Sequence, residues 1–522
     1  MVSLETKSRI IQKYIDEGYW KKETFGEMLR RVAKKFPDNN AISDGEVTIT
    51  YAKWDKMVDG MCNILEDKGI KVFDRVILQM PNSINFFVIS FALFRMGAIP
   101  IFALPAHRGN EIKSFIKVAE PSAHIICKKH LGFDYQSMAD ECVQGTNCQV
   151  WMEDDLISIN SVDVEPYEDK ANAFETAVLL VSGGTTGIPK LIPRTHADYL
   201  YDADTFAKVC KFSEETVYLA AIPAAHNFAF ANPGIVGTML NGGESVMART
   251  GSPDEILELI ECEYVTTTAM VPSLLAVCSD MAGWEEFNLE SMETILVGGS
   301  TVSYEILAKG KEAFDCEIRQ VYGTAEGVNC ICPEDMPLKD MADCQGRAIS
   351  EADKVRIIDA NGNFLGNGKI GELVLRGPYT ILNYYNCEAA NEESFMEDGF
   401  YKTGDMAFVD EDENLHVIGR LKEQINKAGE KIVPSELEEI IGSHEQIRDV
   451  AVIGIDDDEL GSKVCVCIVS DADIKLEDLC AFMEKKQIAS YKWPDCIFRV
   501  DNFPLTAVGK VDKNKLKAMH IG

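Results

Sequence analysis

Short apolar runs alternate with amphipathic stretches across most of the first 400 residues. The apolar runs have the length and composition of buried strands, and they are residues 75–80, 123–127, 177–181, 216–220, 294–297 and 317–322. Residues 54–68, 253–263 and 303–314 repeat apolar positions at helical spacing. Strand and helix in alternation predict a parallel α/β sheet.

One apolar segment, residues 84–105, approaches the length that a membrane-spanning helix needs. Arg95 lies in its middle, and Gly97 and Pro100 interrupt it. A buried helix over residues 83–95 followed by a buried strand over 98–103 fits this pattern better. Residues 1–22 are charged throughout and contain no apolar signal-peptide core, so we expect a cytosolic protein with no membrane partner.

The pattern changes twice in the last third of the chain. From residue 354 short alternating strands at 354–358 and 371–375 predict a small antiparallel β subdomain. After residue 421 a separate mixture of helix and strand begins. We therefore predict an α/β protein with a large N-terminal domain over 1–421, which includes a β subdomain at about 345–421, and a mobile α+β domain over 422–522.

Composition narrows the classes of partner. The 522 residues include 51 basic and 84 acidic side chains, for a net charge of −33, which argues against a nucleic-acid partner or an anionic membrane surface. The 16 cysteines include no C-x-x-C pair and no His/Cys cluster at the spacing of zinc ligands. Many lie in apolar runs, which predicts free core thiols in a reducing compartment.

The segment 182–190, Ser-Gly-Gly-Thr-Thr-Gly-Ile-Pro-Lys, directly follows the predicted strand at 177–181. Glycines bring backbone N–H groups close to an anion, and hydroxyls and an ammonium add donors and charge. The spacing differs from a Walker A loop, because Lys190 lies three residues beyond Gly187 with Pro189 between them. Taken alone, the segment is either a phosphate-binding loop or an ordinary structural turn.

Further polar clusters follow other predicted strands. They are residues 225–228, 297–300 and 321–327, and two more turns lie at 401–405 and 419–420. Ligands of parallel sheets collect at the carboxyl ends of strands, so these turns are candidates for one site. A Thr-Ala-Val-Gly-Lys-Val-Asp segment at 506–512 lies close to the end of the chain.

These motifs, in this order, resemble those of the adenylate-forming superfamily, which includes acyl-CoA synthetases, non-ribosomal peptide adenylation domains and luciferases. The similarity extends over nearly the whole chain. Residues 190–196, 225–228, 376–380 and 424–431 resemble most closely the stand-alone aryl acid–AMP ligases. Those enzymes activate 2,3-dihydroxybenzoate or salicylate with ATP and Mg²⁺ for siderophore or non-ribosomal peptide biosynthesis, and pass the acyl group to the phosphopantetheine of an aryl carrier protein.

The resemblance implies a role for each matching position. Thr185, Thr186 and Lys190 would hold the β- and γ-phosphates, Glu326 would bind Mg²⁺, and Lys510 would neutralise charge at the reacting carboxylate and α-phosphate. Asp405 would accept the ribose hydroxyls beside Arg420. Other nucleotide contacts would come from Gly183, Gly299, Val321, Tyr322, Gly323, Thr324 and Val417. Lys422 would be the hinge, and Gly429 would line the pantetheine channel.

The acid-binding positions implied by the resemblance are His226, Asn227, Phe228, Asn232, Ser300, Ala325 and Asn329. The substrate carboxylate is already ionised at neutral pH, so His226 is expected to gate or pack and not to act as a base. Asn227 favours an ortho-hydroxy aromatic acid.

Asn232, Ser300 and Asn329 are polar where the siderophore enzymes tend to have other residues. They suggest a substrate with an added ring nitrogen, amine or hydroxyl, such as a hydroxypicolinate-like or aminobenzoate-like acid. The alternative is that these side chains point away from the ring.

Each single residue also has an ordinary structural interpretation. Val321 and Val417 fit core packing as well as they fit adenosine binding, and a lone Asp or Arg is usually a turn former or a solvated charge. The nearest rival function is an aryl-CoA ligase of the same fold. A luciferase-like oxidation, a P-loop NTPase and a nucleotide-sensing binding protein agree less well with the motifs.

Overall fold

The computed structural model describes residues 2–158, 161–182, 190–284, 287–427, 430–457, 460–486, 488–506 and 509–521. The chain divides into two compact units. The first contains residues 1–355 and 375–401, and the second contains residues 356–374 and 402–522. The predicted boundary at residue 421 lies inside the second unit, and the division into domains of 1–421 and 422–522 stays a prediction.

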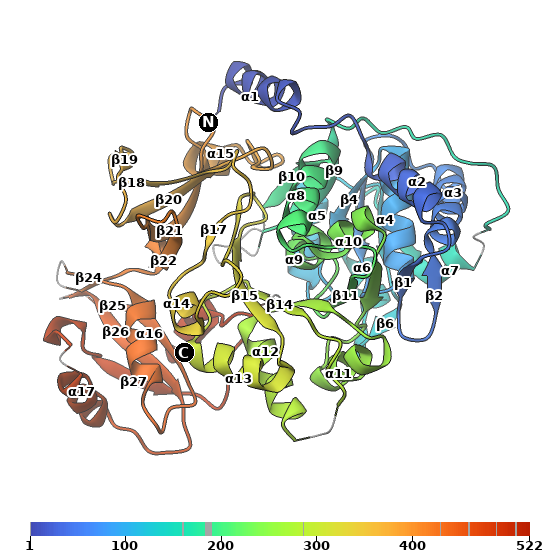
Figure 1. Cartoon of the computed structure of the whole chain (residues 1–522). Helices are drawn as coiled ribbons and strands as arrows, with labels where there is room; N and C mark the ends of the chain where they lie inside the picture. The colour runs from blue at the N-terminus through green and yellow to red at the C-terminus, as the bar shows by residue number, and fades with distance from the viewer. Residues whose placement is uncertain are drawn as a thin grey trace. The chain divides into compact units, whose positions relative to one another are not determined.

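The larger sheet of the first unit has nine strands in the order β17-β16-β15-β14-β13-β11-β12-β1-β2 (Figure 1). The six from β15 to β1 are parallel, as the alternation of strand and helix predicted. The nine strands are β1 (Asn40–Ser43), β2 (Thr48–Thr50), β11 (Val217–Ala220), β12 (Glu244–Met247), β13 (Thr267–Met270), β14 (Thr294–Gly298), β15 (Glu317–Gly323), β16 (Asn329–Ile331) and β17 (Arg347–Ala348).

A second sheet of the same unit has six strands in the order β10-β9-β4-β3-β5-β8. All are parallel except β10, which forms an antiparallel hairpin with β9. They are β3 (Arg75–Gln79), β4 (Ile99–Phe102), β5 (Ala123–Ile126), β8 (Gln149–Met152), β9 (Thr176–Val181) and β10 (Leu191–Thr195), and a small ribbon comprises β6 (Lys129–His130) and β7 (Phe133–Asp134).

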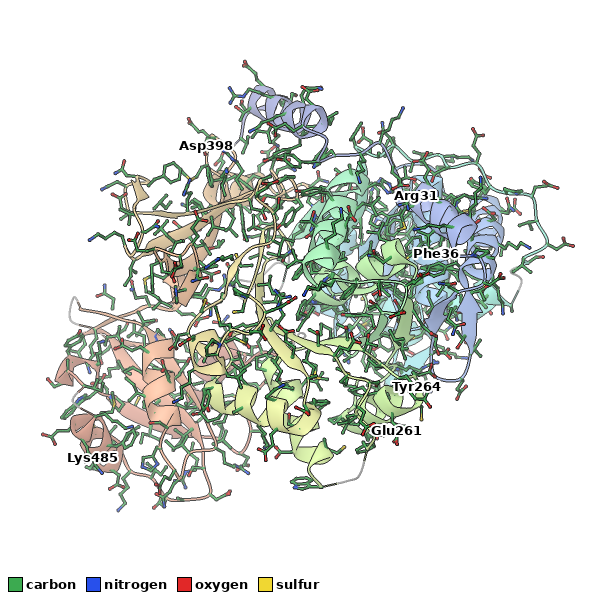
Figure 2. The ribbon with its side chains drawn as sticks, in the orientation of Figure 1. Arg31, Phe36, Glu261, Tyr264, Asp398 and Lys485 are labelled. Atoms are coloured by element: carbon green, nitrogen blue, oxygen red, sulfur yellow. The ribbon has the colours of Figure 1, made fainter. Side chains whose placement is uncertain are left out.

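Helices pack on these sheets, and α2, α3 and α4 lie against one another (Figure 1). Figure 2 shows the side chains, among them Arg31 on α2 and the exposed Tyr264 beyond the end of α11. The helices of this unit are α1 (Leu4–Asp16), α2 (Phe25–Lys35), α3 (Tyr51–Asp67), α4 (Ile84–Met96), α5 (Gly109–Ala119), α6 (Tyr135–Cys142), α7 (Glu153–Ile157), α8 (His196–Val209), α9 (Asn227–Ala231), α10 (Gly234–Asn241), α11 (Pro253–Cys262), α12 (Pro272–Ala282), α13 (Tyr304–Phe314), α14 (Leu338–Ala342) and α15 (Glu388–Ser394).

The long apolar segment forms a buried helix and strand, as predicted. Ser83 caps α4, Gly97 ends it with a φ of +69°, and β4 follows. Arg95 is buried and forms ion pairs of 2.6 Å with both Asp55 and Asp59, which explains how a charge is accommodated in the apolar segment. Among the described residues no helix combines the length and the apolar character that crossing a membrane requires.

The second unit contains most of one five-stranded sheet, ordered β19-β18-β20-β21-β22, and the whole of another, in which β24-β23-β26-β25 are neighbours and β27 pairs with β26. Helix α16 packs on β25. The strands are β18 (Lys354–Ile358), β19 (Phe364–Leu365), β20 (Gly371–Arg376), β21 (Tyr401–Val409), β22 (Leu415–Arg420), β23 (Ile425–Lys427), β24 (Glu430–Ile432), β25 (Asp449–Asp457), β26 (Gly461–Val469) and β27 (Cys496–Arg499). The helices are α16 (Pro434–Gly442), α17 (Leu476–Lys485) and α18 (Lys513–Ile521), with short 3-10 turns at Leu421–Glu423 and Ser490–Lys492.

Candidate functional site

The glycine-rich segment joins the two antiparallel strands β9 and β10. Its central residues 183–189, among them Gly183, Thr185 and Thr186, lie outside the described residues. The ends of the segment face each other, because the Ser182 N–H donates to the Lys190 carbonyl at 3.0 Å and the Lys190 N–H donates to Ser182 Oγ at 3.0 Å. This pairing fixes where the segment leaves the sheet and where it returns.

Lys190 and Glu326 both contact the same tyrosine. The Lys190 ammonium lies 4.6 Å from the centre of the Tyr384 ring, and the Tyr384 hydroxyl donates to Glu326 Oε1 at 2.9 Å. Burial and the Glu326 carboxylate raise the pKa of Tyr384, so its hydroxyl stays protonated and remains a donor. The structure thus brings together Lys190, predicted to bind phosphate, and Glu326, predicted to bind magnesium.

Glu326 has the chemistry of a ligand for a hard cation. It is buried, and its backbone is held by a hydrogen bond from the Ile381 N–H to its carbonyl at 2.8 Å. Tyr384 occupies Oε1, and among the described groups none donates a hydrogen bond to Oε2. A carboxylate with one oxygen fixed and a second available suits Mg²⁺, which binds through one or two carboxylates.

The predicted adenosine contacts of the first unit lie at the carboxyl ends of β14 and β15. Gly298 and Val321 are register partners on these parallel strands, and Gly299 follows with a φ of +92°, where a side chain would be strained. Tyr322 and Gly323 end β15, and the turn that follows closes through a hydrogen bond from Thr324 Oγ1 to the Gly327 carbonyl at 2.9 Å. These residues therefore lie together at the ends of two adjacent strands, and their role in binding adenosine stays a prediction.

The predicted acid-binding residues on α9 are fixed by local contacts. His226 precedes the helix and accepts a hydrogen bond from the Phe228 N–H on Nδ1 at 3.2 Å. Asn227 accepts one from the Tyr199 hydroxyl on Oδ1 at 2.7 Å. The Phe228 ring lies against Gly298, where an added Cβ would come within 3.2 Å of the ring. These contacts connect α9 to the strand end that bears Gly299.

Asn232 and Asn329 meet at one buried carboxylate. Asn232 Nδ2 lies 3.2 Å from both oxygens of Asp202, and Asn329 Nδ2 lies 2.8 Å from Asp202 Oδ1. The two amides thus share a partner on α8. Ser300, in contrast, is exposed just beyond Gly299.

Arg194 balances the charge of this carboxylate. It is fully buried, and its guanidinium bonds Asp198 at 2.7 Å, Asp202 at 3.1 Å and the Ala325 carbonyl at 3.3 Å. It also lies 4.3 Å from the centre of the Tyr199 ring. Through these contacts Arg194 connects α8 to the turn after β15. It also contacts Tyr199, which bonds Asn227.

The second unit holds the remaining predicted nucleotide residues. Asp405 on β21 is buried opposite Arg420 on β22, and the two form an ion pair of 2.8 Å. Arg420 also donates to the Thr403 carbonyl at 3.2 Å, while Thr403 Oγ1 accepts from the Asp405 N–H at 2.9 Å. Val417 lies on β22 opposite Ala407. The pair presents one acid and one guanidinium from adjacent strands.

Lys510 lies within the electrostatic reach of that pair. Displacement of water by the surrounding protein and the positive charge of Arg420 lower the pKa of Lys510, while Asp405 and Glu423 oppose the shift. The backbone of Lys510 closes a turn with Thr506 through two hydrogen bonds of 2.7 and 3.2 Å. Lys422 follows β22 in a short 3-10 turn, and Gly429 lies outside the described residues.

Several residues at these sites had no role assigned from the sequence. Tyr199, Asp202 and Tyr384 each bond a predicted site residue that is distant in sequence. Tyr384 lies between two predicted motifs and belongs to neither. Asp198 and Asp202 are four residues apart on α8, and this spacing was a signal that could have indicated two carboxylates on one helix face.

The structure also gathers Cys465, Cys496 and His520, whose ligand atoms lie within 4.8 Å of one another in the second unit. Cys465 and Cys496 are register partners on the parallel strands β26 and β27. The sequence spacing showed no such cluster, because its three members come from three separate elements.

Two known protein families match successive parts of the chain. Residues 29–385 match the AMP-binding enzyme family, and residues 436–510 match the AMP-binding enzyme C-terminal domain.

Individual relatives match over nearly their whole length. The chain is 40% identical to a 2,3-dihydroxybenzoate-AMP ligase of Bacillus subtilis, with 97% of this chain and 96% of that protein covered. It is 37% identical to a salicyl-AMP ligase / salicyl-S-ArCP synthetase of Mycobacterium tuberculosis, with 96% and 92% covered. Among solved structures, apo MbtA of Mycobacterium smegmatis matches with a TM-score of 0.74 and 34% identity over 98% of this chain and 97% of that one.

Proposed function

This chain belongs to the AMP-binding enzyme family, and from that membership we propose that it activates an aromatic carboxylic acid as an acyl-adenylate. We propose further that it transfers the acyl group to the phosphopantetheine thiol of an aryl carrier protein, in biosynthesis of the siderophore or non-ribosomal peptide type. The observation that carries the proposal is the full-length similarity to a 2,3-dihydroxybenzoate-AMP ligase and a salicyl-AMP ligase.

In the first step, an oxygen of the substrate carboxylate attacks the α-phosphorus of ATP, and the bond to the β-phosphate oxygen breaks to release pyrophosphate. Negative charge gathers on the phosphate oxygens, so catalysis requires fixed cations and donors. Lys190 is the residue proposed for this role, and its position at the end of the glycine-rich segment, beside Tyr384, supports the proposal. Lys510, next to Asp405 and Arg420, supplies a second cation.

Glu326 is the residue proposed to hold Mg²⁺, which when bound neutralises phosphate charge. Asp405 is the proposed acceptor for the ribose hydroxyls, and its bond to Arg420 fixes the carboxylate for that task. No general base is needed, because the attacking carboxylate is already ionised near neutral pH.

In the second step, the thiol sulfur attacks the acyl carbon, loses its proton, and displaces AMP, so that a thioester forms. Lys422 is the proposed hinge that moves Lys510 away and brings Gly429 and its neighbours to the thiol. Asn227, whose amide oxygen is held by the Tyr199 hydroxyl, is the proposed contact for the carboxylate and ortho-hydroxyl of the acid.

Acid-dependent exchange of labelled pyrophosphate into ATP tests the first step. We expect exchange with salicylate or 2,3-dihydroxybenzoate and none with aliphatic acids of similar size. Exchange without any acid, or with aliphatic acids alone, would contradict the proposal. Including 3-hydroxypicolinate in the panel tests whether a heteroaromatic acid is preferred.

The acceptor is tested by supplying CoA or a holo aryl carrier protein and following AMP release. We expect multiple turnovers with the carrier protein. Turnover with CoA alone would assign the chain to the aryl-CoA ligases instead.

A further inference from the structure

The two asparagines that meet at Asp202 are oriented by it. An ionised carboxylate only accepts hydrogen bonds, so each asparagine must turn its NH₂ group toward Asp202. Asn232 and Asn329 do so with Nδ2 at 3.2 and 2.8 Å. The amide oxygens must then face elsewhere, and neither side chain can rotate by half a turn without placing an oxygen against the carboxylate.

Asp202 is held in its ionised form by Arg194. The guanidinium bonds Asp202 Oδ2 at 3.1 Å and is itself fully buried. Burial raises the pKa of Asp202 to about 6 and Arg194 opposes that rise, so the group is mainly a carboxylate at pH 7.5. Two further carboxyl groups act on Asp202: Asp198, which bonds the same guanidinium at 2.7 Å, and Asp353.

The amide oxygen of Asn232 lacks a partner. Asn232 is 2% exposed, and among the described residues nothing donates a hydrogen bond to its Oδ1. Buried amide oxygens are rarely left unpaired in proteins, because the lost hydrogen bond weakens the folded state. The oxygen of Asn329 lies beside Gly323, the last residue of β15, where an added Cβ would come within 2.1 Å of it.

We propose that Asp202 is a positioning residue that turns the Asn232 amide oxygen toward the ring of the acid, so that the enzyme selects an aryl acid whose ring bears an amino or hydroxyl donor. This inference rests on the proposed function and narrows it. The donor is a group additional to the ortho-hydroxyl assigned to Asn227. A ring nitrogen has only a lone pair to offer, and it would face a second acceptor. Of the polar groups that the sequence suggested, the amine and the hydroxyl therefore fit, and the ring nitrogen does not.

Matched acids test the selection directly. The panel contains salicylates that carry an amino or a methyl group at each free ring position in turn, because these groups are similar in size and only the amino group donates. At one ring position we expect the amino-substituted salicylate to have a kcat/KM for pyrophosphate exchange at least about tenfold above that of the methyl-substituted salicylate. One buried hydrogen bond provides a difference in this range. We expect 3-hydroxypicolinate to be poorer than salicylate. Equal values for amino and methyl partners at every position would overturn the proposal.

An isosteric variant tests the role of Asp202. In Asp202→Asn the new amide can donate as well as accept, so Asn232 is free to turn its NH₂ group to the ring. We expect the amino-to-methyl ratio to fall at least fivefold, mainly through KM for the acid, with KM for ATP unchanged. An unaltered ratio would overturn the proposal.

Asp59→Asn is the matched control. Asp59 likewise accepts from a buried arginine, Arg95, at 2.6 Å, and its bonds to Arg30 and the Tyr167 N–H involve no predicted site residue. The Asp59→Asn variant should lower the free energy of unfolding by a similar amount and leave the amino-to-methyl ratio of kcat/KM unchanged. If Asp202→Asn does not fold, Asn232→Ala removes the acceptor itself and should abolish the preference; retention of the preference would count against the proposal.

Different results would count against the proposed function and against the role of Asp202 and Asn232. If no aromatic acid supports exchange, the proposed function is wrong. If salicylate supports exchange but donors bring no advantage, only the role of Asp202 and Asn232 is wrong.

Discussion

At the scale of single residues, the interior of the first unit depends on buried polar groups that satisfy one another. The Tyr379 hydroxyl donates to Asp353 Oδ2 at 2.6 Å and accepts from the Asn329 N–H at 3.0 Å. The hydroxyl of Tyr218, equally buried on β11, has no partner among the described residues. The two tyrosines are therefore alike in burial and opposite in hydrogen bonding.

Removing each hydroxyl should have different consequences. Tyr379→Phe leaves a buried carboxyl group and a backbone N–H unpaired, so we expect the free energy of unfolding to fall by about 1–3 kcal/mol. Tyr218→Phe removes a hydroxyl that already lacks a partner and should change stability by less than about 0.5 kcal/mol, or increase it. Urea denaturation measures both, and equal losses would contradict this assignment of hydrogen bonds.

Asp353 should make stability depend on pH. Burial, aided by the charge of Asp202, raises its pKa to about 8, against the opposing effects of Tyr379, the Ser350 backbone and Lys354. Between about pH 4 and pH 8 the folded state thus keeps a proton that the unfolded state releases, so this group lowers stability as the pH rises, by at most about 1.4 kcal/mol per pH unit.

Asp353→Asn cannot ionise, and we expect its stability to decline less steeply than that of the wild type between pH 5 and pH 8. Denaturation midpoints in urea at several pH values provide the comparison. Parallel curves for the two proteins would show that Asp353 titrates normally.

At the scale of elements, the periodicity of the sequence was sufficient to locate β3, β5, β14 and β15, because buried strands and amphipathic helices are specified by local patterns. The same patterns placed polar turns at strand ends, which is where Gly299 and Tyr322 lie. They could not show that Asn329 pairs with Asp202 or that Tyr384 pairs with Glu326, because these partners lie far apart in sequence. Side-chain pairing over such separations depends on the folded backbone and leaves no local pattern.

The role of His226 follows from its position at the start of a helix. His226 is the N-cap residue directly before α9 and accepts a hydrogen bond from the Phe228 N–H on Nδ1, so its side chain caps the helix that bears Asn227. We expect His226→Asn, which can accept the same hydrogen bond, to keep the exchange rate within about fivefold of the wild type and to leave its pH profile unchanged, whereas His226→Ala raises KM for the acid. Loss of a pH dependence near the usual pKa of histidine, about 6.5, in His226→Asn would instead identify it as a base.

At the scale of the whole molecule, the predicted reaction draws on residues from both compact units. Glu326, Lys190 and the predicted acid-binding residues belong to the first unit. Asp405, Arg420 and Lys510 belong to the second. The two half-reactions need not use the same groups, because pyrophosphate leaves in the first step and AMP leaves in the second.

Lys510→Ala should therefore separate the two half-reactions. Loss of a cation at the reacting phosphate should reduce pyrophosphate exchange by a factor of about 100 or more, since single stabilising groups contribute on that order to charged transition states. Thioester formation from a preformed acyl-adenylate should survive, because the negative charge has by then largely left with pyrophosphate. Lys515→Ala is the matched control: Lys515 is an exposed lysine on α18 that pairs with Asp512 at 3.3 Å, and its loss should affect neither step. Equal loss of both half-reactions in Lys510→Ala would show that this lysine acts in both steps or only supports the fold, and circular dichroism of the variant distinguishes these two outcomes.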